Sequence, residues 1–132
     1  MEDPDLKGRC ILLVGDDHMV AKSLARLLEL WGAKIVGPTS TVDRAFALLR
    51  STRKIDFGLL DITLREGTVF PVADALMARG VPFAFTTGSS TSIIPERYRD
   101  VPVLQKPYDD DEISKTLLPP TACAAARVAA DR

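Results

Sequence analysis

Five short apolar runs, separated by segments with helical spacing, constrain the fold of this chain more than any other feature. They cover residues 10–14, 33–36, 57–60, 81–85 and 101–104. Their length and their branched side chains are typical of strands that are buried on both faces, as in a parallel sheet. The chain has 132 residues, which is enough for one domain with a single core.

The segments between the runs predict helices. One amphipathic stripe ends at a capping glycine, Gly32, and consists of Val20, Leu24, Leu27, Leu28 and Trp31. A second helix is expected to begin at Thr41, a third to cover 68–79 and a last one to cover 109–118. The polar segment 89–98 is interrupted by proline, which predicts a short or irregular helix.

This alternation of strands and helices predicts an α/β fold: a doubly wound, five-stranded parallel sheet with helices on both faces, of the flavodoxin-like type. We expect the domain to span 9–118, after an N-terminal extension over 1–8. The Ala-rich tail, 119–132, is expected to be disordered or a frayed helix.

Composition excludes several classes of function. The 17 Lys and Arg residues nearly balance the 18 Asp and Glu residues without a basic run, so we expect neither nucleic acid nor a membrane as a partner. The sequence shows no apolar stretch near 18 residues and no leader, which predicts a cytoplasmic protein. Cys10 and Cys123 lack metal-binding or redox spacing and are expected to be reduced thiols.

Polar residues follow the ends of four of the predicted strands. They are Asp16 and Asp17, Asp61, Thr86 and Thr87, and Lys106. The carboxyl ends of parallel strands meet at one edge, where ligands bind in open α/β sheets. Clustered carboxylates there suit Mg²⁺, an Asp can be a nucleophile toward phosphorus, and a Lys and a Thr hydroxyl can contact phosphoryl oxygens.

Four motifs in this order, VGDD, LLDIT, TTG and QKP, make the chain resemble the receiver domain of two-component response regulators. The resemblance covers roughly residues 9–118. The stretch FAFTTG is similar to the Phe-Ala-Thr-Gly subgroup of single-domain receivers, with Thr86 in place of the Ala.

The resemblance implies Asp61 as the phosphoacceptor, Thr87 as the hydroxyl that follows the phosphoryl group and Lys106 as its cationic contact. It also implies Mg²⁺ as the cofactor, held partly by Asp61 and by the backbone carbonyl of Thr63. Many receivers carry an aromatic switch residue where this chain has Val103.

The acidic pair departs from the family pattern. A gap-free count from Val14 to the helix-closing glycine puts the two family acids at Gly15 and Asp16, so that one acid is missing. Asp16 matches the direct metal ligand. Asp17 either compensates in metal binding or caps the next helix, because an acid is favoured at a helix start in any case.

The resemblance implies a stand-alone response regulator in a phosphorelay. It would accept its phosphoryl group from a sensor histidine kinase or a histidine phosphotransfer protein, and would be no enzyme beyond weak self-catalysed chemistry. One alternative is a degenerate receiver that binds a partner without phosphorylation, as the missing acid at Gly15 allows. The other is a Mg²⁺-dependent aspartyl phosphatase, which requires an acid where this chain has Thr63.

Overall fold

The computed structural model describes residues 6–52, 54–64, 67–88, 94–106 and 109–117. Strands and helices alternate along these residues as the sequence predicts. The elements in chain order are β1 Cys10–Val14, α1 His18–Leu30, β2 Lys34–Thr39, α2 Val42–Ser51, β3 Phe57–Asp61, β4 Thr63–Leu64, β5 Gly67–Thr68, α3 Phe70–Ala78, β6 Phe83–Thr87, the 3₁₀ helix η2 Glu96–Tyr98, β7 Val103–Gln105 and α4 Asp110–Leu117.

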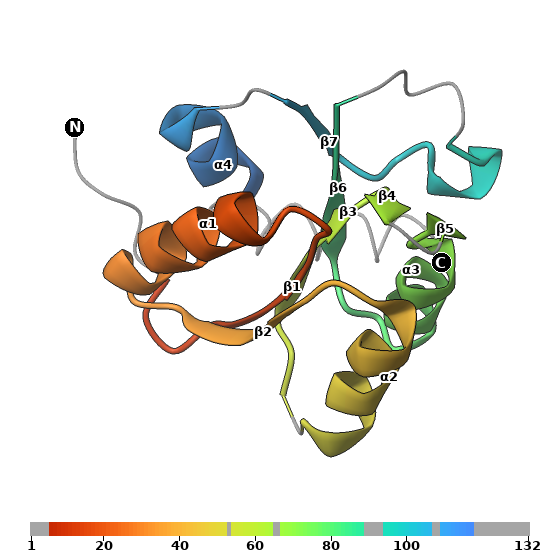
Figure 1. Cartoon of the computed structure of the whole chain (residues 1–132), viewed down its shortest axis with the longest axis horizontal. Helices are drawn as coiled ribbons and strands as arrows, with labels where there is room; N and C mark the ends of the chain where they lie inside the picture. The colour runs from red at the N-terminus through yellow and green to blue at the C-terminus, as the bar shows by residue number, and fades with distance from the viewer. Residues whose placement is uncertain (1–5, 53, 65–66, 89–93, 107–108, 118–132) are drawn as a thin grey trace.

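The main sheet has five strands in the order β2-β1-β3-β6-β7, and every pair is parallel. Helices α1 and α4 cover one face of this sheet, whereas α2 and α3 cover the other (Figure 1). The predicted doubly wound fold is thereby confirmed. Within the described residues, no helix is both long and apolar enough to cross a membrane.

Alternation along the strands divides the core into two layers. On β1, Leu12 and Val14 pack with the α2 and α3 side chains, while Ile11 and Leu13 pack with α1 and α4. Successive strand residues point to opposite faces, so a strand covered on both sides is apolar throughout. This explains why the inner strands β1, β3 and β6 carry almost wholly buried runs, whereas the edge strand β2 includes the exposed Lys34.

Local capping sets the helix starts. The Thr41 hydroxyl accepts a hydrogen bond from the Arg44 amide at 3.2 Å, which starts α2 where the sequence predicts it. Before α4, Asp109 and Glu112 form a reciprocal capping box: each backbone amide donates to the carboxylate of the other residue. These side chains satisfy amides that would otherwise lack partners within the helix.

Two predicted helix boundaries differ from the structure. Helix α3 begins at Phe70 rather than at residue 68, because 67–68 pair with 63–64 in a small antiparallel hairpin that the sequence did not predict. Of the predicted irregular helix over 89–98, only the short turn η2 lies among the described residues. The tail, 119–132, lies outside them.

The described part of the predicted N-terminal extension contacts the core. Leu6 is fully buried with the α1-side cluster, and its amide donates to the Trp31 carbonyl at 2.8 Å. A single buried leucine has no periodicity by which the sequence could reveal it. The domain boundaries stay a prediction.

Candidate functional site

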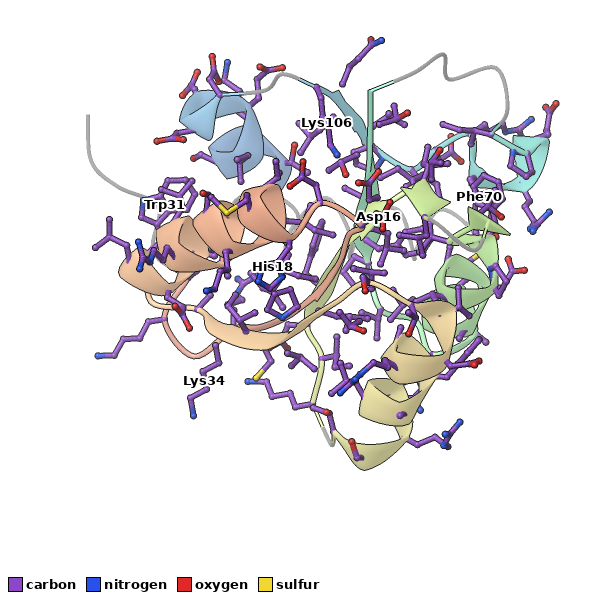
Figure 2. All side chains as sticks on the ribbon, in the orientation of Figure 1. Asp16, His18, Trp31, Lys34, Phe70 and Lys106 are labelled. Atoms are coloured by element: carbon purple, nitrogen blue, oxygen red, sulfur yellow. The ribbon has the colours of Figure 1, made fainter. Side chains whose placement is uncertain are left out.

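The last residue of β3 pairs with a lysine that follows β7. Lys106 Nζ donates to Asp61 Oδ2 at 2.8 Å, and the side chains are only 28% and 12% exposed. Lys106 and Asp16 lie toward the same end of the sheet in Figure 2. A carboxylate this buried is costly without a partner, and the lysine supplies one.

Strand β6 lies between β3 and β7, so the Asp61–Lys106 ion pair spans it. Thr86 on β6 is the register partner of Asp61. Because Leu59, Ala84 and Leu104, two positions earlier on the three strands, share the α1-side core cluster, alternation brings Asp61, Thr86 and Lys106 to this face as well. All three side chains line one cavity.

The two adjacent acids after β1 differ in their surroundings. Asp17 is the N-cap of α1, and its Oδ1 accepts from the Val20 amide at 3.1 Å. Asp16 is half-buried and lines a hollow with Asp61, Thr63 and Lys106. Asp17 borders this hollow too. Its metal role stays a prediction, and the cap gives its carboxylate a structural role.

Gly15 faces the candidate phosphoacceptor. A Cβ atom at this position would lie 3.8 Å from Asp61 Cβ and 4.0 Å from Asp61 Oδ2, in ordinary van der Waals contact. A carboxylate at position 15 would therefore reach the same hollow as Asp61. That a family acid is missing at this position stays a prediction.

Thr87, the predicted switch hydroxyl, ends β6 and is 2% exposed. Its carbonyl accepts from the Lys106 amide at 2.7 Å, which holds the lysine's backbone beside β6. It is Thr86 rather than Thr87 that lines the cavity with Asp61. The sequence places Thr86 at a strand end but assigns it no role.

The donor set suits a hard cation. Among the described residues, no group of three or more His, Cys, Asp or Glu side chains could hold a metal ion. Mg²⁺ needs fewer, because it is commonly held by one or two carboxylates together with waters and substrate oxygens. Asp16 and Asp61, with Thr63 at the rim of the same hollow, fit that requirement.

A second carboxylate–cation pair lies on the α3 side. Arg97 makes two hydrogen bonds to Asp74, of 3.0 and 3.2 Å, and its guanidinium lies 4.5 Å from the ring centre of Tyr98. The Tyr98 hydroxyl also donates to Asp74. Burial and the Asp74 hydrogen bond raise the pKa of Tyr98 to about 12, and the hydrogen bond from Arg97 lowers the pKa of Asp74.

No family model matches the chain, and no curated protein matches it. Solved structures do. SdrG from Sphingomonas melonis Fr1 is 42% identical, with a TM-score of 0.73, and the match covers 83% of this chain and 92% of that one. The BeF3-activated conformation of SdrG from Pseudomonas melonis Fr1 matches at 41% identity over 82% of this chain and 92% of that one, with a TM-score of 0.68. This chain belongs to the response-regulator receiver domains.

More distant receiver domains share the fold alone. A CheY-like receiver domain protein from Methanospirillum hungatei JF-1 is 18% identical, with a TM-score of 0.77, and the match covers 90% of this chain and 98% of that one. The sheet order found here is that of the same CheY-like fold. In this receiver domain, the roles of Asp61, Thr87 and Lys106 and of the Mg²⁺ ligands stay predictions.

Proposed function

We propose that this receiver domain accepts a phosphoryl group on Asp61 from a sensor histidine kinase or a histidine phosphotransfer protein, and signals through altered protein contacts. The observation that carries the proposal is the buried Asp61–Lys106 ion pair, with its 2.8 Å contact at the carboxyl end of the sheet. The carboxylate is the acceptor, and the ammonium is placed to contact the oxygens of the arriving group.

The chemistry needs few groups. An Asp61 oxygen attacks phosphorus, the bond from phosphorus to the donor breaks, and the donor leaves with the electron pair. Lys106 turns from the carboxylate to a phosphoryl oxygen. Mg²⁺, held by Asp16, Asp61 and the carbonyl of Thr63, would neutralise the charge that separates donor and acceptor.

The relatives support the same site chemistry. SdrG has been solved in a BeF3-activated conformation, and its match to this chain includes most of both sequences. The closeness of Gly15 to Asp61 favours one second candidate, a receiver that binds its partner without phosphorylation. An aspartyl phosphatase is less favoured, since the exposed residue two positions after Asp61 is Thr63 and not an acid.

The test is incubation with phosphoramidate and Mg²⁺, followed by intact mass measurement. We expect one phosphoryl group on the parent protein and none on Asp61→Asn, while the matched Asp43→Asn variant, changed on the first turn of α2, is modified like the parent. Modification that persists in Asp61→Asn contradicts the proposal. Phosphotransfer profiling against kinases of the same genome then identifies the donor.

A further inference from the structure

A small cavity lies beside the Asp61–Lys106 ion pair. Its volume is about 20 Å³, whereas roughly 10–15 Å³ suffices for one water molecule if two or more polar partners are present. Most of its walls are apolar side chains of β1, α1 and β3, such as Leu13, Ala21 and Leu59. Asp61, Thr86 and Lys106 supply polar groups that a water would need, and Asp17, whose Oδ1 already accepts from the Val20 amide, also borders the cavity.

Thr86 is the polar residue beneath the ion pair. It is 5% exposed and lies on β6, between the strand that ends in Asp61 and the strand that leads to Lys106. Among the described residues, the Thr86 hydroxyl has no hydrogen-bond partner. Unlike Thr39 Oγ1, the Thr86 oxygen is not among the fully buried atoms that lack a partner, so a small molecule can reach it. The hydroxyl is therefore available to a molecule in the cavity.

We propose that Thr86 positions one water molecule in this cavity, and that this water shortens the lifetime of the aspartyl phosphate. The effect on the lifetime of the aspartyl phosphate rests on the proposed function, whereas the position of the water does not. The water donates to the Asp61 carboxyl group, and the Thr86 hydroxyl fixes the orientation of the water. Thr86 is thus a positioning residue that acts through the water.

Hydrolysis of the aspartyl phosphate explains the direction of the effect. A solvent water attacks phosphorus, the bond from phosphorus to the Asp61 oxygen breaks, and the electron pair remains on Asp61 as a carboxylate. The attacking water leaves as part of inorganic phosphate, with both of its protons passing to the phosphate or to solvent. Negative charge grows on the Asp61 oxygens, so a hydrogen bond to them is stronger in the transition state and accelerates the step.

The isosteric variant Thr86→Val tests the proposal. We expect the phosphoryl group, formed with phosphoramidate and Mg²⁺, to persist roughly 3–10 times longer, the size of one ordinary hydrogen bond. Thr86→Ser keeps a hydroxyl at this position and is expected to have the lifetime of the parent protein. The matched control is Thr39→Val, which makes the same change at the end of β2, where the hydroxyl has no partner, and should leave the lifetime unchanged.

A high-resolution crystal structure of the unphosphorylated protein tests the water itself. We expect one water within hydrogen-bond distance of Thr86 Oγ1 and the Asp61 carboxylate, and its loss in Thr86→Val. If that variant does not fold, Thr86→Ala replaces it. An unchanged lifetime in the variant, no rescue by Ser, or no water in the parent overturns the inference. If Asp61 takes no phosphoryl group at all, the proposed function fails, while the crystal structure still decides the water.

Discussion

Two carboxylate–cation pairs in this molecule show opposite designs. Asp61 and Lys106 meet through one contact of 2.8 Å between largely buried side chains. Asp74 and Arg97 meet through two hydrogen bonds, with about half of each side chain exposed. In the buried pair, the Lys106 ammonium makes one contact with Asp61, so it can turn to an anionic group that binds in the site. The exposed pair is tied into a larger cluster, which holds its segment in place.

The aromatic rings behind the second pair show what is held. Tyr98 is 1% exposed, stacks on Phe70 at 5.4 Å and meets Phe85 edge-on at 5.3 Å. Phe85 lies on β6, directly before Thr86. One strand therefore carries a packed aromatic ring on its α3 face and the polar site on its α1 face. We call the packed rings of Tyr98, Phe70, Phe83 and Phe85 the aromatic frame, and we expect it to stay in place when Asp61 is modified. Position 103, where many receivers have an aromatic switch residue, is a valine in this chain.

The largest expected effect is the loss of stability when the Tyr98 ring is removed from the aromatic frame. Tyr98→Ala removes a buried ring that contacts three other aromatic rings, and we expect the free energy of unfolding to fall by about 3–5 kcal/mol. Urea unfolding measures it. Tyr98→Phe keeps the ring and should cost only about 1 kcal/mol. Equal losses in the two variants would show that the hydroxyl, and not ring packing, holds the segment.

The missing acid gives the next largest effect. Gly15→Asp places a carboxylate beside Asp61 and should tighten Mg²⁺ binding roughly 10–100-fold, the range for groups around a metal's direct ligands. Calorimetric titration measures the affinity. Asp17→Ala should lose about 1 kcal/mol of stability as a helix cap and leave Mg²⁺ binding nearly unchanged. If instead Asp17→Ala abolishes Mg²⁺ binding, Asp17 serves as the missing acid.

Removal of the buried cation should have a smaller effect on stability and a clear one on signalling. Lys106→Ala leaves the Asp61 carboxylate without its cation, and we expect a loss of about 1–2 kcal/mol, since part of the lysine is solvated. The fold persists, but phosphorylation no longer changes partner binding. Arg97→Gln, at the exposed pair, is the control and should keep that response. A Lys106→Ala protein that signals like its parent would make Lys106 purely structural.

The last effect is seen only at alkaline pH. The pKa of Tyr98 is about 12 in the folded protein against 10.0 for an ordinary tyrosine, so folding favours the protonated hydroxyl. This contribution to stability is complete below pH 10 and is lost as pH rises toward 12. Urea midpoints measured between pH 8 and 12 should fall more steeply for the parent than for Tyr98→Phe. Parallel curves would assign the alkaline loss to other groups.

The sequence predicts the parts of this fold that repeat along the chain. Doubly buried strands appear as continuous apolar runs, amphipathic helices show a period near 3.6 residues, and Thr41 has the side chain of an N-cap. The hairpin of β4 and β5 has two-residue strands, which are too short for any period. The contact of Tyr98 with Asp74 joins residues 24 positions apart, and no local pattern encodes it.

The site divides in the same way. The topology rule predicts that Asp61 and Lys106 meet, and the structure brings them together. Residues 15–17 lie between the end of β1 and the start of α1, where the alternation of a strand no longer tells which way a side chain points. The direction of a Cβ at position 15 and the helix cap formed by Asp17 therefore had to come from the structure. The sequence left the role of Asp17 open for this reason.

The most direct test of the account follows both pairs by NMR as beryllofluoride and Mg²⁺ are added. We expect large chemical-shift changes for Gly15, Thr86 and the Lys106 ammonium, and small ones for the Tyr98 ring and the Arg97 guanidinium. Asp61→Asn should abolish the shifts. Unchanged signals around Asp61, or shifts that persist in Asp61→Asn, would contradict the claim that Asp61 accepts the phosphoryl group while the Asp74–Arg97 pair holds the frame.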